Sequence, residues 1–304
     1  MNTPLRRLLR ITPQQLRAFE MTARLLSVTR AAEALHLSQP TVSMQIKELA
    51  QVIGEPLFEY AGRRLRLTQT GEALQQTVGE LVDCWQRFES NLNEQRGLVS
   101  GRLRIAAVTT AEYFVPDLIG PFAAAHPGIE LELCIENRER VVQRLQQRSD
   151  DLAVMMLPPQ ELPLRTLPFL DNPLVVVARS DHPCAGATLE LAALAQERWL
   201  MREAGSGTRR VTEQHFAEAG FRPRIAMSLG SNEAIKHSVA AGLGIAVLSR
   251  LAIAPAGSDL GSTGLCELPV RGFPIERRWS LVWRSDHPLS ATARRFISYL
   301  QPAR

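Results

Sequence analysis

Six apolar residues recur at alternating intervals of four and three in the segment 68–96. This spacing is typical of one long helix with a single narrow apolar stripe, as in a coiled coil. A stripe of this kind needs a partner helix, so the pattern predicts dimerisation. The alternative is that the stripe packs on the helix's own molecule. The predicted dimerisation residues are Leu74, Val78, Leu81, Trp85, Phe88 and Leu92.

Basic charge is concentrated on the amino-terminal side of this helix. Residues 1–70 contain ten Lys and Arg against five acidic residues, whereas all 304 residues together carry a formal charge of +4. A small basic unit beside a near-neutral body favours a polyanion partner. No apolar run is long enough to span a bilayer, and no signal-peptide pattern follows the first ten residues. We therefore expect a cytoplasmic protein that has no membrane partner.

The segment before the long helix predicts three short helices. Thr12 can cap the first helix, with Pro13 in its first turn and Gln15 completing a capping box. The second helix carries Ala32, and a tight turn joins it to a third helix that begins at Ser38. A small residue at the crossing permits the close approach of helices in a helix-turn-helix.

The outward face of the third helix carries side chains that suit the edges of bases. In a helix-turn-helix this helix enters the major groove with its amino-terminal residues at the bases. Gln can form two hydrogen bonds with adenine, Ser bonds several bases, and Met makes only apolar contact. An ordinary three-helix bundle with a polar face is the alternative. The predicted DNA-binding residues of this helix are Ser38, Gln39, Pro40, Thr41, Ser43, Met44, Gln45 and Lys47.

Residues 57–67 predict a β-hairpin directly after the third helix. Residues 60–62 are typical of a turn, and apolar and basic residues then alternate as in a half-buried strand. Arg63, Arg64 and Arg66 would lie at the hairpin edge, where contact with phosphates fixes register without sensing base sequence. The pattern thus predicts a winged helix-turn-helix over 1–68 and a linker helix over 69–96.

Beyond residue 97 the pattern changes to alternating short strands and helices. Apolar strands are predicted at 103–108, 129–135, 152–156, 174–178, 199–201, 225–229, 244–248 and 279–283. Such alternation predicts an α/β domain over 97–304. We expect two lobes, lobe I at about 101–172 and 275–304 and lobe II at about 173–274. A cleft between such lobes, at the carboxyl ends of strands, is where ligands bind.

Clusters of polar residues follow several of the predicted strands and should meet in this cleft. Hydroxyl and backbone N–H groups before a helix suit an anion, and a guanidinium group matches a carboxylate or phosphate. For each residue taken singly, a helix cap or a loop turn is an equally good interpretation. Together they favour a small anionic effector. The predicted effector-binding residues are Thr109, Thr110, Asn137, Arg138, Arg202, Ser206, Gly207, Thr208, Arg209, Asn232 and Glu233.

No motif in the sequence indicates catalysis or a metal site. Gly205-Ser206-Gly207 lacks the spacing of a nucleophile elbow, and none of the six His lies in a metal or triad motif. A solute-binding protein would explain the α/β half but not the basic helix-turn-helix. We therefore expect no catalytic residue and no cofactor beyond the effector. Four cysteines, too widely spaced for a zinc site, are expected to be buried free thiols: Cys84, Cys134, Cys184 and Cys266.

Several motifs at fixed spacing carry a family resemblance. They are Ala31-Ala32-Glu33-Ala34-Leu35-His36-Leu37-Ser38-Gln39-Pro40-Thr41-Val42-Ser43, Gly54-Glu55-Pro56-Leu57-Phe58-Glu59 and Arg64-Leu65-Arg66-Leu67-Thr68-Gln69-Thr70-Gly71. In these the chain resembles the LysR-type transcription regulators, and the resemblance covers nearly the whole chain. It implies a winged helix-turn-helix on promoter DNA, a homodimer that often becomes a homotetramer, and a periplasmic-binding-protein-like effector domain. RNA polymerase is a further partner that the resemblance implies.

Three shorter motifs narrow the resemblance. They lie at 39–45, where Met44 replaces the Arg or His of many relatives, at 202–209 and at 231–236. These are similar to regulators of the RuBisCO operon, which belongs to Calvin-cycle carbon fixation. This branch implies a phosphorylated sugar or a nucleotide as effector. Regulation of sulfur, amino-acid or aromatic metabolism is the alternative.

Overall fold

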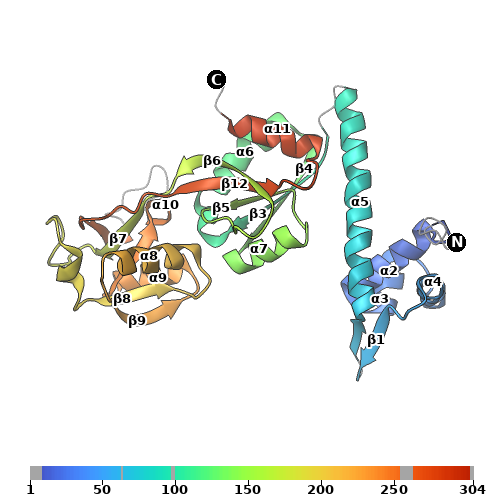
Figure 1. Cartoon of the computed structure of the whole chain (residues 1–304), viewed down its shortest axis with the longest axis horizontal. Helices are drawn as coiled ribbons and strands as arrows, with labels where there is room; N and C mark the ends of the chain where they lie inside the picture. Colours follow the sequence, from blue (N-terminus) through green and yellow to red (C-terminus); the bar gives the residue numbers. More distant parts are fainter. Residues whose placement is uncertain (1–8, 63, 97–99, 254–262, 302–304) are drawn as a thin grey trace. The chain divides into compact units, whose positions relative to one another are not determined.

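The structure, a computed structural model, describes residues 9–62, 64–96, 100–253 and 263–301. The chain divides into two compact units, Met1–Phe88 and Glu89–Arg304. The boundary between them lies inside the long helix and not at one of its ends (Figure 1). In the part of the chain that is described, no helix is long and apolar enough to cross a membrane.

The first unit is a cluster of helices with a β-hairpin. Its elements are α2 (Pro13–Leu25), α3 (Val28–Leu35), α4 (Gln39–Ile53), β1 (Phe58–Ala61), β2 (Arg64–Leu67) and the first part of α5 (Gln69–Gln95). The predicted capping box of Thr12 and Gln15 is confirmed, because each side chain bonds the other residue's backbone N–H. Ser38 caps α4 as predicted, since its hydroxyl accepts from the Thr41 N–H.

Two small apolar clusters hold this unit together. In the first, Ala18, Ala31 and Ala32 are buried where α2, α3 and α4 cross, so that small side chains permit the close approach. The second cluster joins α5 to the other helices, and its buried members are Phe19, Ala23, Leu49, Leu57 and Val78. The start of α5 is therefore part of the helix-turn-helix core.

The second unit contains two five-stranded sheets, one in each lobe. In lobe I the order is β4-β3-β5-β12-β6, and in lobe II it is β11-β7-β10-β8-β9. Lobe I strands are β3 (Gly101–Val108), β4 (Ile129–Glu136), β5 (Leu152–Met155), β6 (Leu164–Asp171) and β12 (Arg278–Arg284). Lobe II strands are β7 (Leu174–Arg179), β8 (Arg198–Arg202), β9 (Arg224–Leu229), β10 (Ile245–Ser249) and β11 (Leu265–Leu268).

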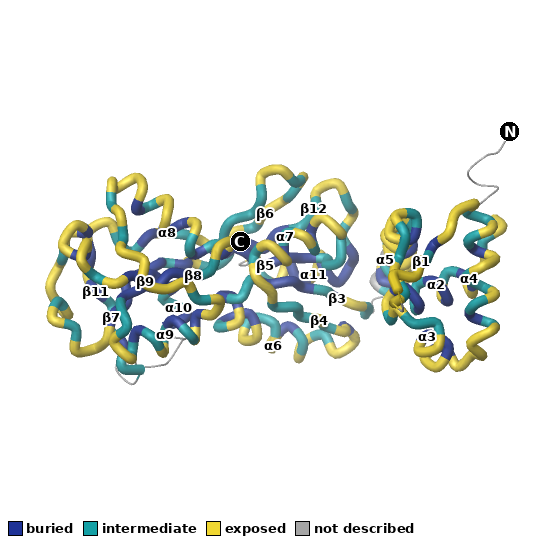
Figure 2. The backbone as a smooth tube through the Cα atoms, turned by 90° about the horizontal axis from the view of Figure 1, so that it is seen from below, coloured by how far each residue is buried: buried dark blue, intermediate teal, exposed yellow. Residues whose placement is uncertain are grey.

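Helices accompany both sheets. Those of lobe I are η1 (Thr109–Tyr113), α6 (Val115–Ala125), α7 (Arg138–Gln146) and α11 (Ala291–Leu300). Those of lobe II are η2 (Leu191–Leu194), α8 (Gly207–Glu218), α9 (Asn232–Ala240) and α10 (Arg250–Ile253). The buried segments follow the middle strands of each sheet, while the helices expose one side (Figure 2). The carboxyl end of β3 continues directly into η1, and β8 is followed after a short turn by α8. The first residues of η1 and of α8 therefore lie at the boundary between the lobes.

The chain crosses between the lobes at two adjacent segments. It leaves lobe I after β6 and returns from β11 into β12, and backbone hydrogen bonds join Leu174 to Ile275 where the crossings meet. Asn172, also at this crossing, is buried, and its side chain bonds Ser249 of lobe II and the Met156 sulfur of lobe I. These bonds tie the two lobes at the crossing point.

Three elements differ from the prediction. The strands β6 and β11 were not expected, since neither segment has a continuous apolar run. A helix directly after the polar residues at 202–206 was not predicted, but Gly207 begins α8, after a turn at Gly205 where φ is +88°. The cysteines are not buried as predicted. Cys84 is exposed on α5, and the other three are only half-buried.

Candidate functional site

The amino-terminal half of α4 presents a row of polar side chains. Ser38 Oγ lies 2.7 Å from Thr41 Oγ1, and Gln39 Nε2 donates to Ser43 Oγ at 3.2 Å. Each of these bonds joins residues one helical turn apart, and all are at the surface. We call this face the α4 surface; its fully exposed members are Ser38, Gln39, Pro40, Met44 and Lys47, and Thr41 and Ser43 are half-buried.

Gln45, also predicted to contact DNA, is half-buried, and its contact with a base stays a prediction. Its side-chain oxygen is buried and has no hydrogen-bond partner among the described residues. The reason is helical geometry, because Gln45 lies between Val42 and Leu49, the two buried residues of α4.

The hairpin after α4 has the predicted alternation. β1 and β2 are antiparallel, with Ala61 opposite Arg64 and Phe58 opposite Leu67. Arg64 and Arg66 are exposed, while Leu65 and Leu67 are half-buried. Arg63, which was also predicted to contact DNA, lies outside the described residues. The contact of these arginines with phosphates stays a prediction.

The apolar stripe of α5 divides into two parts. Val78 is 3% exposed and Leu74 packs on the same cluster, so these two residues belong to the core of their own unit. This corrects the prediction that all six stripe residues face a partner. Leu81, Trp85 and Phe88 are 43%, 62% and 53% exposed, so the rest of the stripe is accessible in this chain. Leu92, the sixth predicted residue, is half-buried and belongs to the second unit.

A small cavity of about 20 Å³ lies between the two lobes. Lobe I contributes the end of β3, the start of α7 and the segment after β5, and lobe II contributes the end of β8 and the start of α8. The predicted residues that line the cavity are Thr109, Thr110, Arg138, Arg202, Ser206, Gly207 and Thr208. The lining residues that were not predicted are Val108, Met155, Met156, Leu157, Glu203 and Trp279.

The start of α8 differs from the starts of α7 and α9. Asn137 and Ser231 cap α7 and α9 with their own side chains, which accept from backbone N–H groups. Ser206 stands at the same position of α8 but makes no such bond, and it is only 6% exposed. Uncapped N–H groups and the helix dipole make the beginning of a helix attractive to anions. This start of α8 lines the cavity.

Arg138 of lobe I adds positive charge to the cavity. Its Nε and Nη2 donate to the Leu157 carbonyl oxygen at 3.1 and 3.0 Å. Burial lowers the pKa of Arg138, and the charge of Arg210 lowers it further. Within the described residues no carboxylate forms an ion pair with Arg138. Its side chain also approaches the α8 start, since a Cβ placed on Gly207 would lie 3.8 Å from Arg138 Cδ.

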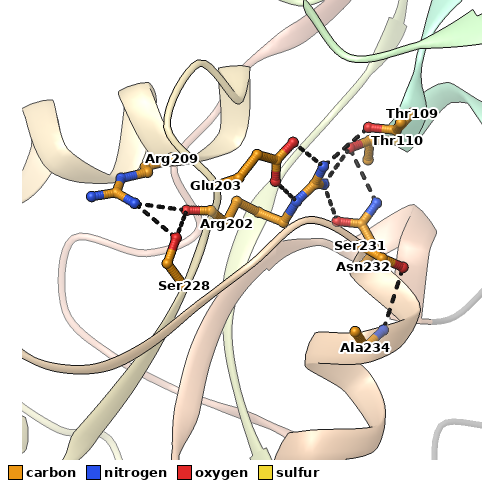
Figure 3. A network of polar contacts seen from close by, with 9 residues as sticks. All are labelled: Thr109, Thr110, Arg202, Glu203, Arg209, Ser228, Ser231, Asn232 and Ala234. Carbon is orange, nitrogen blue, oxygen red and sulfur yellow. Dashed lines mark hydrogen bonds and ion pairs between the residues drawn. The ribbon is translucent and has the colours of Figure 1, made fainter.

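Arg202 is the centre of a network that joins the lobes (Figure 3). Its side chain is 1% exposed, and its Nε and Nη2 donate to the two carboxylate oxygens of Glu203 at 2.8 and 3.0 Å. Nη2 also donates to Thr109 Oγ1 at 3.1 Å, and Nη1 donates to Thr110 Oγ1 and Asn232 Oδ1. Because a guanidinium group has five N–H donors, these five bonds use all of them.

Four predicted residues do not line the cavity. Arg209 turns away from it, donating to the Arg202 carbonyl oxygen, Ser228 Oγ and Glu213. Asn137 is the cap of α7, which was the alternative interpretation. Asn232 and Glu233 begin α9, and their side chains bond residues of η1 in lobe I, beside the cavity.

Comparison with known proteins identifies the family. Residues 96–304 match the LysR substrate binding domain, and residues 13–72 match the bacterial regulatory helix-turn-helix proteins of the lysR family. The chain is a LysR-type transcription regulator. The expected fold, a helical DNA-binding unit followed by a two-lobed α/β effector domain, is confirmed.

This LysR-type regulator has curated relatives along nearly its whole length. A RuBisCO operon transcriptional regulator of Acidithiobacillus ferrooxidans is 41% identical over 290 residues, 95% of this chain and 93% of that protein. One of Allochromatium vinosum is 42% identical over 291 residues, 95% of each chain. The predicted resemblance to regulators of this operon is therefore confirmed.

A solved structure resembles the effector domain of this regulator. It is the Synechocystis PCC6803 CcmR regulatory domain in complex with 2-PG, 44% identical, with a TM-score of 0.62. The match covers 66% of this chain and 95% of that one.

Residues such as Trp279 and Met156 were missed in the cavity because each is an apolar residue of a strand or its end, and no local signal separates it from the core.

Proposed function

We propose that this regulator controls the transcription of carbon-fixation genes, and that a small anionic metabolite bound between its lobes modulates this control. The observation that carries the proposal is the uncapped start of α8 beside Arg138 in the interlobe cavity. The identity of the target genes rests on the relatives that regulate the RuBisCO operon. A regulator of this kind acts in the cytoplasm, on promoter DNA, with RNA polymerase as a further partner.

The α4 surface is the part of the regulator that we assign to base recognition. Among the described residues, the side chains of Gln39 and Ser43 are bonded only to each other, so they can exchange this bond for bonds to bases without disturbing the fold. The exposed Met44 offers apolar contact to a thymine methyl group. Arg64 and Arg66 of the hairpin would contact phosphates on either side.

Self-association would bring two such surfaces to one operator. We assign the exposed part of the α5 stripe, Leu81, Trp85 and Phe88, to contact with a second copy of this chain. These residues continue the four-three spacing of a coiled coil, and a twofold pair of α4 helices would fit two half-sites. Assembly of dimers into a tetramer is part of the same proposal.

The anionic class of the effector follows from the charges around the cavity. Arg138 and the α8 start are positive, and the Ser206 and Thr208 side chains at this start are nearly buried. The Synechocystis relative was solved with 2-PG, 2-phosphoglycolate, which has this chemistry. A cavity of about 20 Å³ holds no more than a water molecule, so the cavity must widen around a bound effector.

Binding to DNA upstream of a RuBisCO operon tests the first half of the proposal. Fluorescence anisotropy of the full chain should show sequence preference, and the affinity should fall steeply as salt concentration rises. A solute-binding protein would show neither property. Equal affinity for this DNA and for a scrambled duplex would overturn the assignment of target genes.

Calorimetric titration with 2-phosphoglycolate tests the second half. Arg138→Ala should weaken binding by about tenfold or more, since it removes a charge-assisted contact. Arg140→Ala is the matched control, because Arg140 lies on the same helix but is exposed, and in the described part of the chain its side chain bonds only Gln143. If both variants bind like the parent chain, the proposed anion site is wrong.

A further inference from the structure

One side of the interlobe contact is closed by direct bonds between protein side chains. Thr109, Thr110 and Tyr113 all lie on η1 of lobe I, and they face residues of lobe II. Arg202 joins Thr109 and Thr110, as described above. Tyr113 Oη donates to Glu233 Oε1, which also accepts from Lys236 Nζ at 2.8 Å. We call these contacts the η1–α9 seam.

The seam is a built arrangement and not a chance surface contact. Arg202, Thr110 and Asn232 are 2%, 5% and 2% exposed. Asn232 Nδ2 donates to Thr110 Oγ1 at 3.2 Å while its Oδ1 accepts from Arg202, so the three side chains form a closed ring. The Lys236 ammonium group lies 5.2 Å from the centre of the Tyr113 ring. Polar groups this deeply buried are retained only when they are bonded.

Arg202 therefore has no unused N–H donor for a ligand. An effector oxygen could bind its guanidinium group only by displacing Glu203, Thr109, Thr110 or Asn232, and the displaced group would lose a charge-assisted bond. The carboxylate of Glu203 already neutralises the buried charge. The positive groups of the cavity that are not neutralised in this way are the α8 start and Arg138.

We propose that Arg202 is a positioning residue that holds η1 of lobe I against lobe II, and that it does not bind the effector. The effector's anionic group then meets the α8 start and Arg138, which line the same cavity but are not part of the seam. In this proposal the location of the ligand rests on the proposed effector site. The role of Arg202 in joining the lobes does not depend on it.

A comparison of probes separates a positioning role from a binding role. The full chain is titrated with 2-phosphoglycolate, ethyl phosphate and glycolate, which carry both anionic groups or only one. If Arg202 joins the lobes, Arg202→Met should lower the affinity for all three probes by a common factor. The reason is that a smaller fraction of the protein then has the closed arrangement. Arg138→Met should instead reduce the preference for probes with the phosphate. A selective loss of one probe class in Arg202→Met would overturn the proposal.

Two measurements without any ligand complete the test. Labels on the exposed residues Gln146 and Glu218, in different lobes, should show a broader distance distribution in Arg202→Met than in the parent chain. In urea unfolding, Arg202→Met and Thr110→Val should be strongly non-additive, since both remove the same contact. Additive effects or an unchanged distance distribution would refute the joining role. Should no probe bind the parent chain, the proposed effector site fails while these two results still decide the role of Arg202.

Thr110→Val is a second variant that tests the proposal if Arg202→Met does not fold. It removes one acceptor of Arg202 and keeps the buried ion pair with Glu203, so it should give the same common loss of affinity to a smaller extent. Thr77→Val is its matched control, because Thr77 is an exposed threonine of α5 whose hydroxyl donates to the Ala73 carbonyl oxygen of its own helix. Equal behaviour of the two threonine variants would contradict the proposal.

Discussion

The α4 surface and the η1–α9 seam are both polar, but their side chains bond partners at very different distances along the chain. Gln39 bonds Ser43, four residues away and at the surface. Arg202 bonds Thr110, which lies 92 residues earlier in the sequence, and both are buried. The first surface can exchange its bonds for those of DNA while the fold stays intact. The second cannot release its bonds without loosening two lobes, which suits a part that switches.

Substitutions in the two regions should differ most in their effect on the free energy of unfolding. Glu203→Ala leaves the buried Arg202 charge without its carboxylate and should lower the free energy of unfolding of the effector domain by about 3 kcal/mol. Gln39→Ala should change the unfolding of its own unit by less than about 0.5 kcal/mol. Urea unfolding followed by tryptophan fluorescence reports the effector domain, since Trp199 and Trp279 are buried there.

An exposed ion pair provides the control for this prediction. Arg209 and Glu213 pair at 2.7 Å with Glu213 half exposed, so Glu213→Ala should cost less than about 1 kcal/mol. If Glu203→Ala costs no more than Glu213→Ala, the contrast between a buried seam and an exposed surface is lost.

The α5 stripe gives a second contrast, within one helix. Val78→Ala removes buried apolar atoms and should lower the stability of the DNA-binding unit by roughly 1.5–3 kcal/mol at most. Leu81→Asp should leave that stability nearly unchanged but split the dimer in sedimentation. A Leu81→Asp protein that still sediments as a dimer would show that other parts of the chain hold the copies together.

DNA binding should distinguish side chains that recognise bases from those that recognise phosphates. Gln39→Ala should cost about 1–3 kcal/mol at one or two base pairs and relax the preference there. Arg64→Ala should weaken binding to all DNA sequences alike. It should also reduce the magnitude of the slope of log K against log salt concentration by about 1. A library of single operator substitutions, measured at several salt concentrations, checks both. A base-specific loss in Arg64→Ala would mean that the hairpin enters a groove.

The range of the contacts also explains what the sequence could predict. The caps of α2 and α4, the strands with continuous apolar runs and the α4 surface follow from residues close together in the chain. The burial of the Gln45 oxygen was not predicted, because a Gln side chain suits base recognition whereas burial depends on which side of α4 packs inward. Val78 was misjudged for the same reason, since a four-three spacing does not say which helix covers each position.

The effector cavity depended on contacts between distant segments, so it could be predicted only in part. Thr109, Thr110 and the α8 start were found because each follows a strand end. Arg202 lines the cavity as predicted, but its five bonds go to four residues, on η1, on α9 and directly after β8, and no local pattern shows that its donors are already used. Arg209 was added by proximity in sequence, although a helical turn directs it to the other side of β8.

Tyr113 provides the mildest test of the seam. Burial raises the pKa of Tyr113, and the hydrogen bond to Glu233 raises it further. In the unfolded chain this phenol loses its proton near pH 10, while in the folded protein it keeps it. Stability should therefore fall as the pH rises above about 10, because the unfolded state binds fewer protons there.

Tyr113→Phe isolates this contribution. The variant loses the bond to Glu233, which should cost about 1 kcal/mol at neutral pH. It should also lose stability less steeply than the parent chain above about pH 10, since phenylalanine has no proton to release. Urea unfolding of both proteins between pH 8 and 11 measures the difference. Parallel curves over this range would mean that Tyr113 reaches solvent and that the η1–α9 seam opens at its Glu233 end.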